Sequence, residues 1–188
     1  MPNIHKSAII DQNAIIGDNV SIGAYTVIEG NVKIADNNTI KSSVYISGNT
    51  EIGSGNIFHS FSSIGSVPQD LKFDNETTYL RIGSNNTFRE YSNVNLGTKG
   101  GGGLTQIGNN SLFMVGSHIA HDCIVGDNIV MANQATLGGH VIVEDNAIIG
   151  GLSGIHQFCR IGSLSMIGGL SAVENDVVPF GLVIGNRA

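Results

Sequence analysis

The chain has 188 residues, of which 41% are hydrophobic and only 13% charged, and its net charge is −6 at pH 7. This acidic balance argues against non-specific nucleic-acid binding, although a local basic pocket for a phosphorylated ligand is compatible with it. The 26 glycines, three prolines and absence of tryptophan argue against a helical or doubly wound protein. The first residues lack a signal-peptide pattern and no run approaches about 18 apolar residues, so we expect a cytoplasmic chain with no integral membrane segment.

A large apolar residue recurs every six residues along most of the chain. The positions are Ile4, Ile10, Ile16, Ile22, Ile28, Ile34, Ile40, Ile46, Ile52, Phe58 and Ile64, then Ile82, Phe88 and Val94, then Ile107, Phe113, Ile119, Val125, Met131, Leu137, Val143, Ile149, Ile155, Ile161, Ile167 and Val173. A smaller side chain, such as Ala14, Val20 or Ala147, stands two residues before each. A helix cannot use this spacing, whereas a short strand followed by a corner rich in Gly, Asp and Asn can. Each hexad therefore predicts one strand and one corner.

Three such segments would close a triangular coil of 18 residues, and parallel coils would stack at roughly 4.8 Å. The chain would then form about nine coils from about 26 strands. The period breaks at about 66–80, "SVPQDLKFDNETTYL", and about 96–106, "LGTKGGGGLTQ". We expect both segments to be loop excursions, of the kind that commonly carry binding functions in solenoids.

The string "SHIAHDCIV", residues 117–125, places histidines inside the repeat. Residues 18 apart should lie above one another in successive coils. The predicted columns are His121, Gly139 and Gln157, then Asp122, His140 and Phe158, then Ala120, Gly138 and His156. His118 should face outward on the adjoining strand. We therefore expect a functional ridge of outward-facing polar side chains along one edge.

This ridge permits two chemistries. Imidazoles and a carboxylate can bind zinc, as in the γ-type carbonic anhydrases among hexapeptide-repeat proteins, or an imidazole can act as a general base beside a carboxylate. We favour the second and expect no metal, because the histidines occupy different columns. A cysteine nucleophile is disfavoured, since Cys123 and Cys159 occupy inward positions. They lie two coils apart, roughly 10 Å, which is too far for an unstrained disulfide.

Four motifs, "SHIAHDCIVGDN", "LGGHVIVED", "AIIGGLSGIHQF" and "QDLKF", together resemble the UDP-N-acetylglucosamine O-acyltransferases of lipid A synthesis, a hexapeptide-repeat acyltransferase family. The resemblance runs from the first hexads to residue 188 and implies an all-β left-handed parallel β-helix as one domain over 1–188. The handedness comes from the resemblance, because most parallel crossovers are right-handed. The resemblance further implies a homotrimer with active sites between subunits, and a C-terminal helical domain that we expect to be absent from this chain.

The resemblance also implies roles for individual residues. His121 matches the general base that deprotonates the 3-hydroxyl of UDP-N-acetylglucosamine as it attacks a 3-hydroxyacyl thioester on the phosphopantetheine of acyl carrier protein, Asp122 matches the acid that orients it, and the Gly139 backbone N–H matches an oxyanion donor. Matches to substrate-binding positions are Gln69, Asp70, Lys72, His118, His140, His156 and Gln157, and matches to the acyl-chain groove are Gly169 and Arg187. No cofactor, metal or covalent acyl-enzyme is implied.

Two positions depart from the family pattern. Asn95 stands where the family has a His-containing strand, and Arg187 stands where an end-of-groove histidine is often found. Two other functions remain open at this point. One is an N-acyltransferase or acetyltransferase acting on a nucleotide-linked 3-amino sugar, and the other is a repeat scaffold without catalysis.

Overall fold

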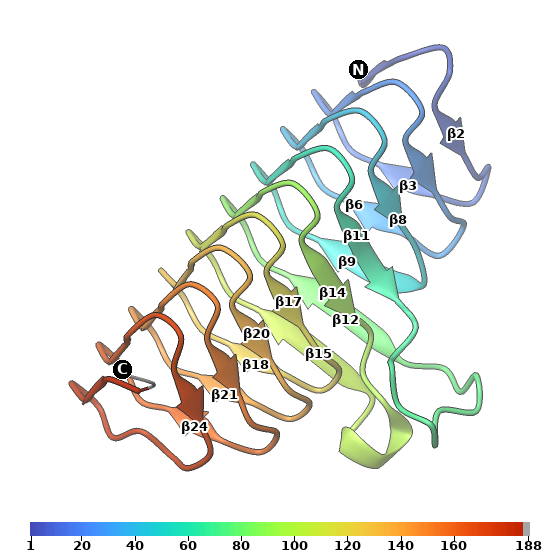
Figure 1. Ribbon diagram of the computed structural model, residues 1–188. Coiled ribbons are helices and arrows are strands. Elements are labelled where there is room, and N and C mark those ends of the chain that lie inside the picture. The colour runs from blue at the N-terminus through green and yellow to red at the C-terminus, as the bar shows by residue number, and fades with distance from the viewer. Residues whose placement is uncertain (186–188) are drawn as a thin grey trace.

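The computed structural model describes residues 1–185, which form a triangular prism of stacked coils with the first and last described coils at its opposite ends (Figure 1). Three parallel sheets make its faces. Sheet A contains β1 (Asn3–Ile4), β4 (Ser21–Ile22), β7 (Thr39–Ile40), β10 (Ile57–Phe58), β13 (Thr87–Phe88), β16 (Leu112–Phe113), β19 (Val130–Met131), β22 (Ile148–Ile149), β25 (Met166–Ile167) and β27 (Leu182–Val183). Sheet B contains β2 (Ile9–Ile10), β5 (Val27–Ile28), β8 (Tyr45–Ile46), β11 (Ser63–Ser66), β14 (Asn93–Asn95), β17 (His118–Ile119), β20 (Thr136–Leu137), β23 (Gly154–Ile155) and β26 (Ala172–Val173). Sheet C contains β3 (Ile15–Ile16), β6 (Lys33–Ile34), β9 (Asn49–Ile52), β12 (Tyr79–Ile82), β15 (Leu104–Ile107), β18 (Ile124–Val125), β21 (Ile142–Val143) and β24 (Arg160–Ile161).

The strand pairing confirms the predicted 18-residue coil. Ile119 of β17 pairs with Leu137 of β20, and Val125 of β18 pairs with Val143 of β21. Within each sheet, a strand is reached after two intervening strands that belong to the other two sheets. Within residues 1–185 the only helix is the single-turn 3-10 helix η1 (Lys99–Gly101), and no helix there is long and apolar enough to cross a membrane.

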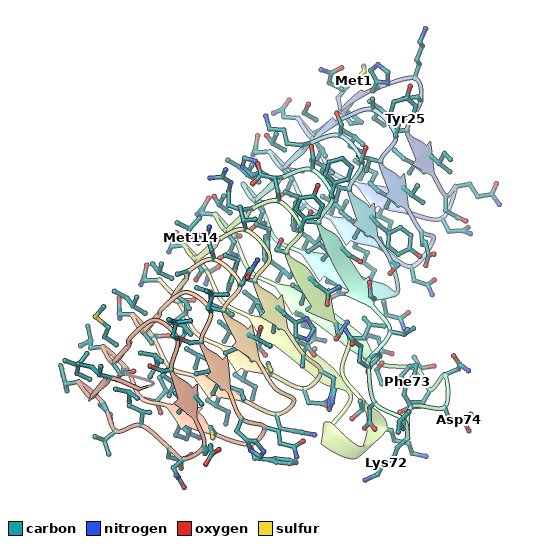
Figure 2. All side chains as sticks on the ribbon, in the orientation of Figure 1. Met1, Tyr25, Lys72, Phe73, Asp74 and Met114 are labelled. Atoms are coloured by element: carbon teal, nitrogen blue, oxygen red, sulfur yellow. The ribbon has the colours of Figure 1, made fainter. Side chains whose placement is uncertain are left out.

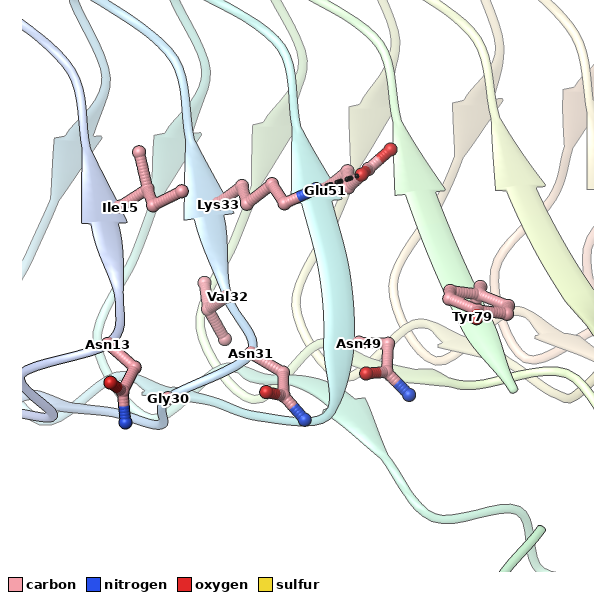
Figure 3. A pocket seen from close by; sticks show the side chains of 9 residues that line it. All are labelled: Asn13, Ile15, Gly30, Asn31, Val32, Lys33, Asn49, Glu51 and Tyr79. Carbon is pink, nitrogen blue, oxygen red and sulfur yellow. Dashed lines mark hydrogen bonds and ion pairs between the residues drawn. The ribbon is translucent and has the colours of Figure 1, made fainter. Parts of the chain in front are cut away.

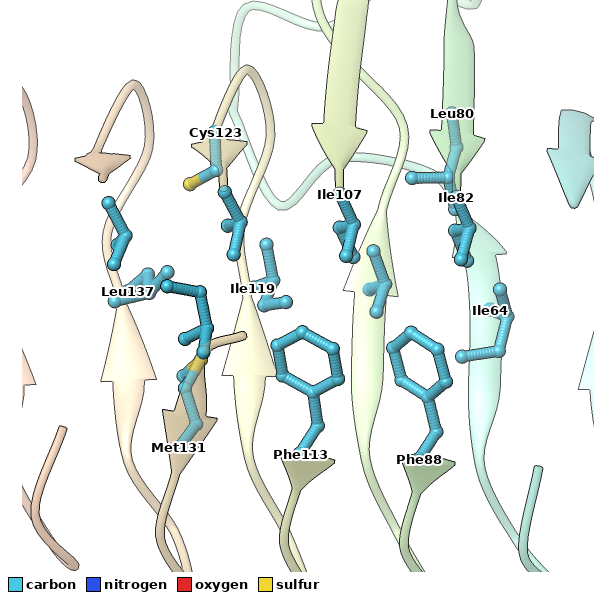
Figure 4. Packing of buried hydrophobic residues seen from close by; sticks show 14 of the residues in the cluster. Ile64, Leu80, Ile82, Phe88, Ile107, Phe113, Ile119, Cys123, Met131 and Leu137 are labelled. Carbon is cyan, nitrogen blue, oxygen red and sulfur yellow. The ribbon is translucent and has the colours of Figure 1, made fainter. Parts of the chain in front are cut away.

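The core is the set of apolar hexad positions, packed along the prism axis. Phe58, Phe88 and Phe113 of sheet A are fully buried and stack with ring centroids 5.0 and 4.7 Å apart. Figure 4 shows Phe88 and Phe113 side by side. The exception is the first coil, where Ile4 is 43% exposed because its strand β1 is the end strand of sheet A and pairs only with β4. Burial therefore depends on having a neighbour on both sides.

The corners are tight because one residue of most turns adopts positive φ. Asp122, His140 and Phe158 share this conformation in one corner column, with φ of 60°, 63° and 69°. Asn and Asp tolerate this region better than other non-glycine residues do. A column at such a corner keeps its side chains in register from coil to coil.

Both predicted excursions are present, with narrower bounds than expected. The first occupies residues 67–78 and the second residues 96–103, because β12 and β15 begin at Tyr79 and Leu104 and each has four residues. The two leave the prism at the same edge (Figure 1). The first carries Lys72, Phe73 and Asp74 away from the body of the molecule (Figure 2).

Candidate functional site

The candidate site is built on the corner between β17 and β18. His121 and Asp122 lie there, and His121 Nδ1 is 2.7 Å from Asp122 Oδ2. Gly139 lies in the next coil beneath the imidazole: a Cβ atom placed on it would be 2.5 Å from His121 Cε1 and 2.7 Å from Nε2. The predicted stacking of His121 on Gly139 is therefore confirmed, and only a glycine lets the ring lie where it does.

The Asp122 carboxylate is buried, a feature that its predicted outward direction does not reveal. Its side chain is 1% exposed because the second excursion covers it. Thr98 donates twice, from its backbone N–H to Asp122 Oδ1 at 2.8 Å and from Oγ1 to Oδ2 at 2.6 Å. The Asp122 backbone N–H donates to Oγ1 of the buried Thr105 at 2.8 Å. Both oxygens act as acceptors, so the proton of the His121 contact belongs to Nδ1 and the Nε2 lone pair is left free.

His140 completes the cluster around Asp122. Its Nε2 is 3.9 Å from Asp122 Oδ2, its ring meets His121 edge-on with centroids 5.1 Å apart, and it stacks on Phe158 at 4.4 Å. These contacts confirm the predicted column of Asp122, His140 and Phe158. The apolar ring of Phe158 supports His140 from the following coil.

His118 lies on β17 beside this corner. Its Nδ1 is 2.8 Å from Asn93 Oδ1, on the adjacent strand β14. Burial and the nearby His121 together lower the pKa of His118 below its ordinary value. The neutral imidazole is therefore favoured, with one ring nitrogen committed to Asn93.

The other predicted substrate-binding residues lie in the following coil and on the first excursion. His156 and Gln157 are exposed one coil beyond Gly139, with His156 Nδ1 3.2 Å from the Gln157 carbonyl oxygen. Gln69, Asp70 and Lys72 lie on the first excursion, where Asp70 Oδ1 accepts a hydrogen bond from the Lys72 N–H at 2.9 Å.

The two predicted groove residues have different outcomes. Gly169 is exposed and stacks over Gly151 at another corner of the prism, where a Cβ would lie 3.3 Å from the Gly151 carbonyl oxygen. Arg187 lies outside the described residues. Of these two residues, only Gly169 can be placed, and it lies at a different corner from His121.

Both cysteines fill the core, as the repeat predicts. Cys123 and Cys159 are buried and free, and burial raises the pKa of the Cys123 thiol to about 12. Burial also raises the pKa of the Cys159 thiol. A thiol so far from forming a thiolate is unsuited to nucleophilic catalysis.

His121, Asp122 and His140 also place one potential metal-ligand atom each within 4.8 Å of the others. In this arrangement Asp122 Oδ2 already accepts from both Thr98 Oγ1 and His121 Nδ1. Asp122 Oδ2 and His121 Nδ1 are thus already engaged in hydrogen bonds. A general-base site without metal stays our prediction.

Sequence reasoning missed three residues of the site: Thr98, Thr105 and Asn93. Thr105 stands two residues before the rung Ile107, so the repeat places it inward but gives no hint of its bond to Asp122. Asn93 is aligned with His118 by strand pairing across an insertion, which a fixed 18-residue column does not reproduce. Thr98 lies in an excursion without any period, and its only sequence signal is its position before a run of four glycines.

Another hollow, of about 300 Å³, lies on the outer face of sheet C toward the N-terminal end (Figure 3). Asn13, Asn31 and Asn49 form a row along it, and Lys33 Nζ pairs with Glu51 Oε1 at 2.9 Å. Paired charges and amides of this kind are typical of a solvated solenoid face. We assign no chemistry to this hollow.

Comparison with known proteins agrees with this geometry. Residues 104–139 match the family described as bacterial transferase hexapeptide (six repeats). The prism and its corner histidines thus define a hexapeptide-repeat transferase. An acyl-[acyl-carrier-protein]–UDP-N-acetylglucosamine O-acyltransferase of Aliarcobacter butzleri is 58% identical over 188 residues, which is 100% of this chain and 72% of the relative. The chain belongs to the family of these O-acyltransferases.

Solved structures give the same result. LpxA from Acinetobacter baumannii superposes with a TM-score of 0.96 at 47% identity, over 97% of this chain and 71% of that one. The UDP-N-acetylglucosamine acyltransferase from Campylobacter jejuni superposes with a TM-score of 0.94 at 44% identity, over 98% of this chain and 72% of that one. The left-handed β-helix expected from the resemblance is thereby confirmed.

Proposed function

We propose that the chain transfers a 3-hydroxyacyl group from acyl carrier protein to the 3-hydroxyl of UDP-N-acetylglucosamine, the first step of lipid A synthesis, and does so in the cytoplasm. The observation that carries the proposal is the His121 imidazole, tied to Asp122 through Nδ1 and lying on Gly139 in a chain of this family. Nε2 is the free basic atom of that arrangement.

In the proposed reaction, Nε2 of His121 takes the proton of the sugar 3-hydroxyl while that oxygen forms a bond to the thioester carbonyl carbon. Asp122 keeps the imidazole in the tautomer that presents Nε2 and stabilises the imidazolium. The C–S bond then breaks, and the imidazolium returns the proton to the departing thiolate of phosphopantetheine. Acceptor and donor meet by proximity in one complex, so no covalent acyl-enzyme and no cofactor is required.

The Gly139 backbone N–H is the proposed oxyanion donor. Among residues 1–185 no acceptor is hydrogen-bonded to it, although the neighbouring N–H groups of Gly138 and His140 donate to Ile155 and His121. A free N–H directly under the base is positioned to stabilise charge that develops on the thioester oxygen.

The proposed active site lies between subunits of a homotrimer. The first excursion, which contains Gln69, Asp70 and Lys72, projects from the prism at Lys72 (Figure 2). A regular prism has few concave surfaces, and packing prisms side by side creates a site from two chains. His118, His140, His156, Gln157 and the groove residue Gly169 would then face substrates held partly by a neighbouring chain.

The test is a transfer assay with 3-hydroxyacyl carrier protein or acetyl-CoA as donor and UDP-N-acetylglucosamine or its 3-amino analogue as acceptor. We expect transfer from the carrier protein to the hydroxyl, and a loss on the order of a hundredfold or more in His121→Ala. Undiminished transfer in this variant would remove His121 as the base. Preference for the amino acceptor would favour the N-acyltransferase alternative, and no transfer by the folded trimer would favour a scaffold.

A second experiment tests whether the active sites are shared between subunits. Chains carrying His121→Ala and chains carrying Lys72→Ala are each expected to be poorly active, and trimers reassembled from both should regain activity. Recovery is expected because some interfaces of a mixed trimer join an intact base to an intact excursion. Mixed trimers no more active than the two parents would place the whole site within one chain.

A further inference from the structure

The second excursion supplies hydrogen-bond donors to both oxygens of Asp122. Thr98 is 5% exposed, and its Oγ1 accepts from the Gly101 N–H at 3.2 Å, which leaves the hydroxyl proton for Asp122 Oδ2. Its backbone N–H holds Oδ1. We propose that Thr98 is a positioning residue for the proposed transfer reaction: it fixes the rotation of the Asp122 carboxylate so that Oδ2 faces Nδ1 of His121.

A carboxylate in this corner needs such a restraint. Terminal carboxylate torsions are broad, so an Asp side chain alone has no sharply preferred orientation. His140 Nε2, 3.9 Å from Oδ2, offers a competing partner. Two donors on one residue, acting on different oxygens, fix the plane of the carboxylate and keep Oδ2 directed at His121.

Gly101 of the second excursion also lies against the Asp122 carboxylate. A Cβ atom on Gly101 would overlap the Asp122 carboxylate, so the backbone of the second excursion is in close contact with that carboxylate. Gly100, one residue earlier, has nothing within 4 Å of the corresponding Cβ position. The two glycines are therefore a matched pair that differ in contact with Asp122.

The excursion is anchored well enough to act as a restraint. The Thr98 carbonyl oxygen accepts from the Gly103 N–H at 2.8 Å, and the Gly97 N–H donates to the Tyr79 carbonyl oxygen at 3.1 Å. Glu76 of the first excursion accepts from the Lys99 N–H at 3.1 Å. Backbone N–H groups, first its own and then that of Lys99, lower the pKa of Glu76, which keeps this link ionised at neutral pH.

The first experiment separates kcat from KM in Thr98→Val and Thr98→Ser. Valine keeps the shape and the backbone donor but removes the hydroxyl, so we expect kcat about tenfold lower, the scale of one hydrogen bond to a charged group, with both KM values within about twofold. Serine restores the hydroxyl and should recover most of kcat. In an Asp122→Asn background, Thr98→Val should cost little more. Additive losses, or a change confined to KM, would overturn the assignment.

The glycine pair gives a second test that leaves Thr98 intact. Gly101→Ala should lower kcat by about tenfold or more, because the added methyl group pushes the carboxylate away from His121. Gly100→Ala is the control and should retain wild-type kcat. Equal activity of the two variants would contradict a restraint that acts through Asp122.

A readout independent of transfer separates this inference from the proposed function. In long-range ¹H–¹⁵N spectra of histidine side chains, with His121 assigned by its absence in His121→Ala, Thr98→Val should shift the His121 Nδ1 resonance and Thr98→Ser should leave it near the wild-type position. The result decides the role of Thr98 even if the wild-type protein transfers no acyl group. An unchanged Nδ1 resonance in Thr98→Val would overturn it.

Discussion

At the scale of single residues, the site depends on the missing side chain of Gly139 as well as on the His121 imidazole. Gly139 has no side chain, and the His121 ring occupies the space that a Cβ would fill. The pattern of hexads places a residue at this point but does not require glycine there. The steric requirement comes from the imidazole one coil away.

We therefore expect Gly139→Ala to displace the His121 imidazole and to lower kcat on the order of a hundredfold, since a misplacement of about 1 Å is enough for such a loss. Gly154→Ala is the matched control, because nothing lies within 4 Å of its Cβ position. Steady-state kinetics of both variants checks this. A Gly139→Ala enzyme as active as the control would show that the His121 imidazole can shift away from the added methyl group without lowering kcat.

His118 makes stability depend on pH. Burial, then the charge of His121, lowers its folded-state pKa, so the folded protein favours neutral His118. Its contribution to the free energy of unfolding is fully present above the unfolded-state pKa of about 6.5 and is lost as pH falls through the lowered folded-state value. We expect the wild-type protein to lose more stability between pH 7.5 and 5 than His118→Gln does.

Urea unfolding followed by circular dichroism at several pH values measures this difference, with protein concentration held constant. The variant is the control for the other histidines, which titrate in both proteins. An identical loss of stability in the two proteins would mean that His118 is as easily protonated when folded as when unfolded.

At the scale of elements, one corner is held by a ladder of buried asparagines. The Asn56 backbone N–H donates to Asn38 Oδ1 at 2.8 Å, Asn56 Oδ1 accepts from the Asn86 N–H at 2.9 Å, and Asn56 Nδ2 donates to the carbonyl oxygens of Gly53 and Gly83. The ladder crosses the coil that carries the first excursion. It keeps the coils in register where the chain inserts extra residues.

Asn56→Ala should therefore destabilise the fold by about 3 kcal/mol, because it leaves buried backbone groups without partners. Asn31→Ala, at an exposed position, should change the free energy of unfolding by less than about 0.5 kcal/mol. Chemical denaturation of both variants checks the prediction. Equal stability would mean that water or a shifted backbone satisfies the freed groups.

At the scale of the whole molecule, stability depends on position along the prism. A repeat array is held by interfaces between neighbouring coils, so a terminal coil has half the contacts of a central one. Ile4 and Ile40 occupy the same column of sheet A, yet Ile4 is 43% exposed and Ile40 is 1% exposed.

We expect Ile40→Ala to cost about 2–5 kcal/mol and Ile4→Ala less than about 1 kcal/mol. The same substitution in the same column controls for residue type and sheet. Urea denaturation at a fixed protein concentration measures both. Comparable costs would imply that the first coil is covered in the assembled protein, for instance by another chain.

The sequence by itself determined the rungs, the three-sided coil and the columns that bring His121 over Gly139 and Asp122 beside His140. It could do so because parallel strands in register convert a spacing of 18 residues directly into vertical contact. The tertiary structure decided the contacts of the segments that lie outside the hexad repeat. The second excursion covers Asp122, Thr98 holds both of its oxygens, and Asn93 reaches His118 across an insertion. The path of such a segment follows from specific contacts with the prism, and these exist only once the prism has formed.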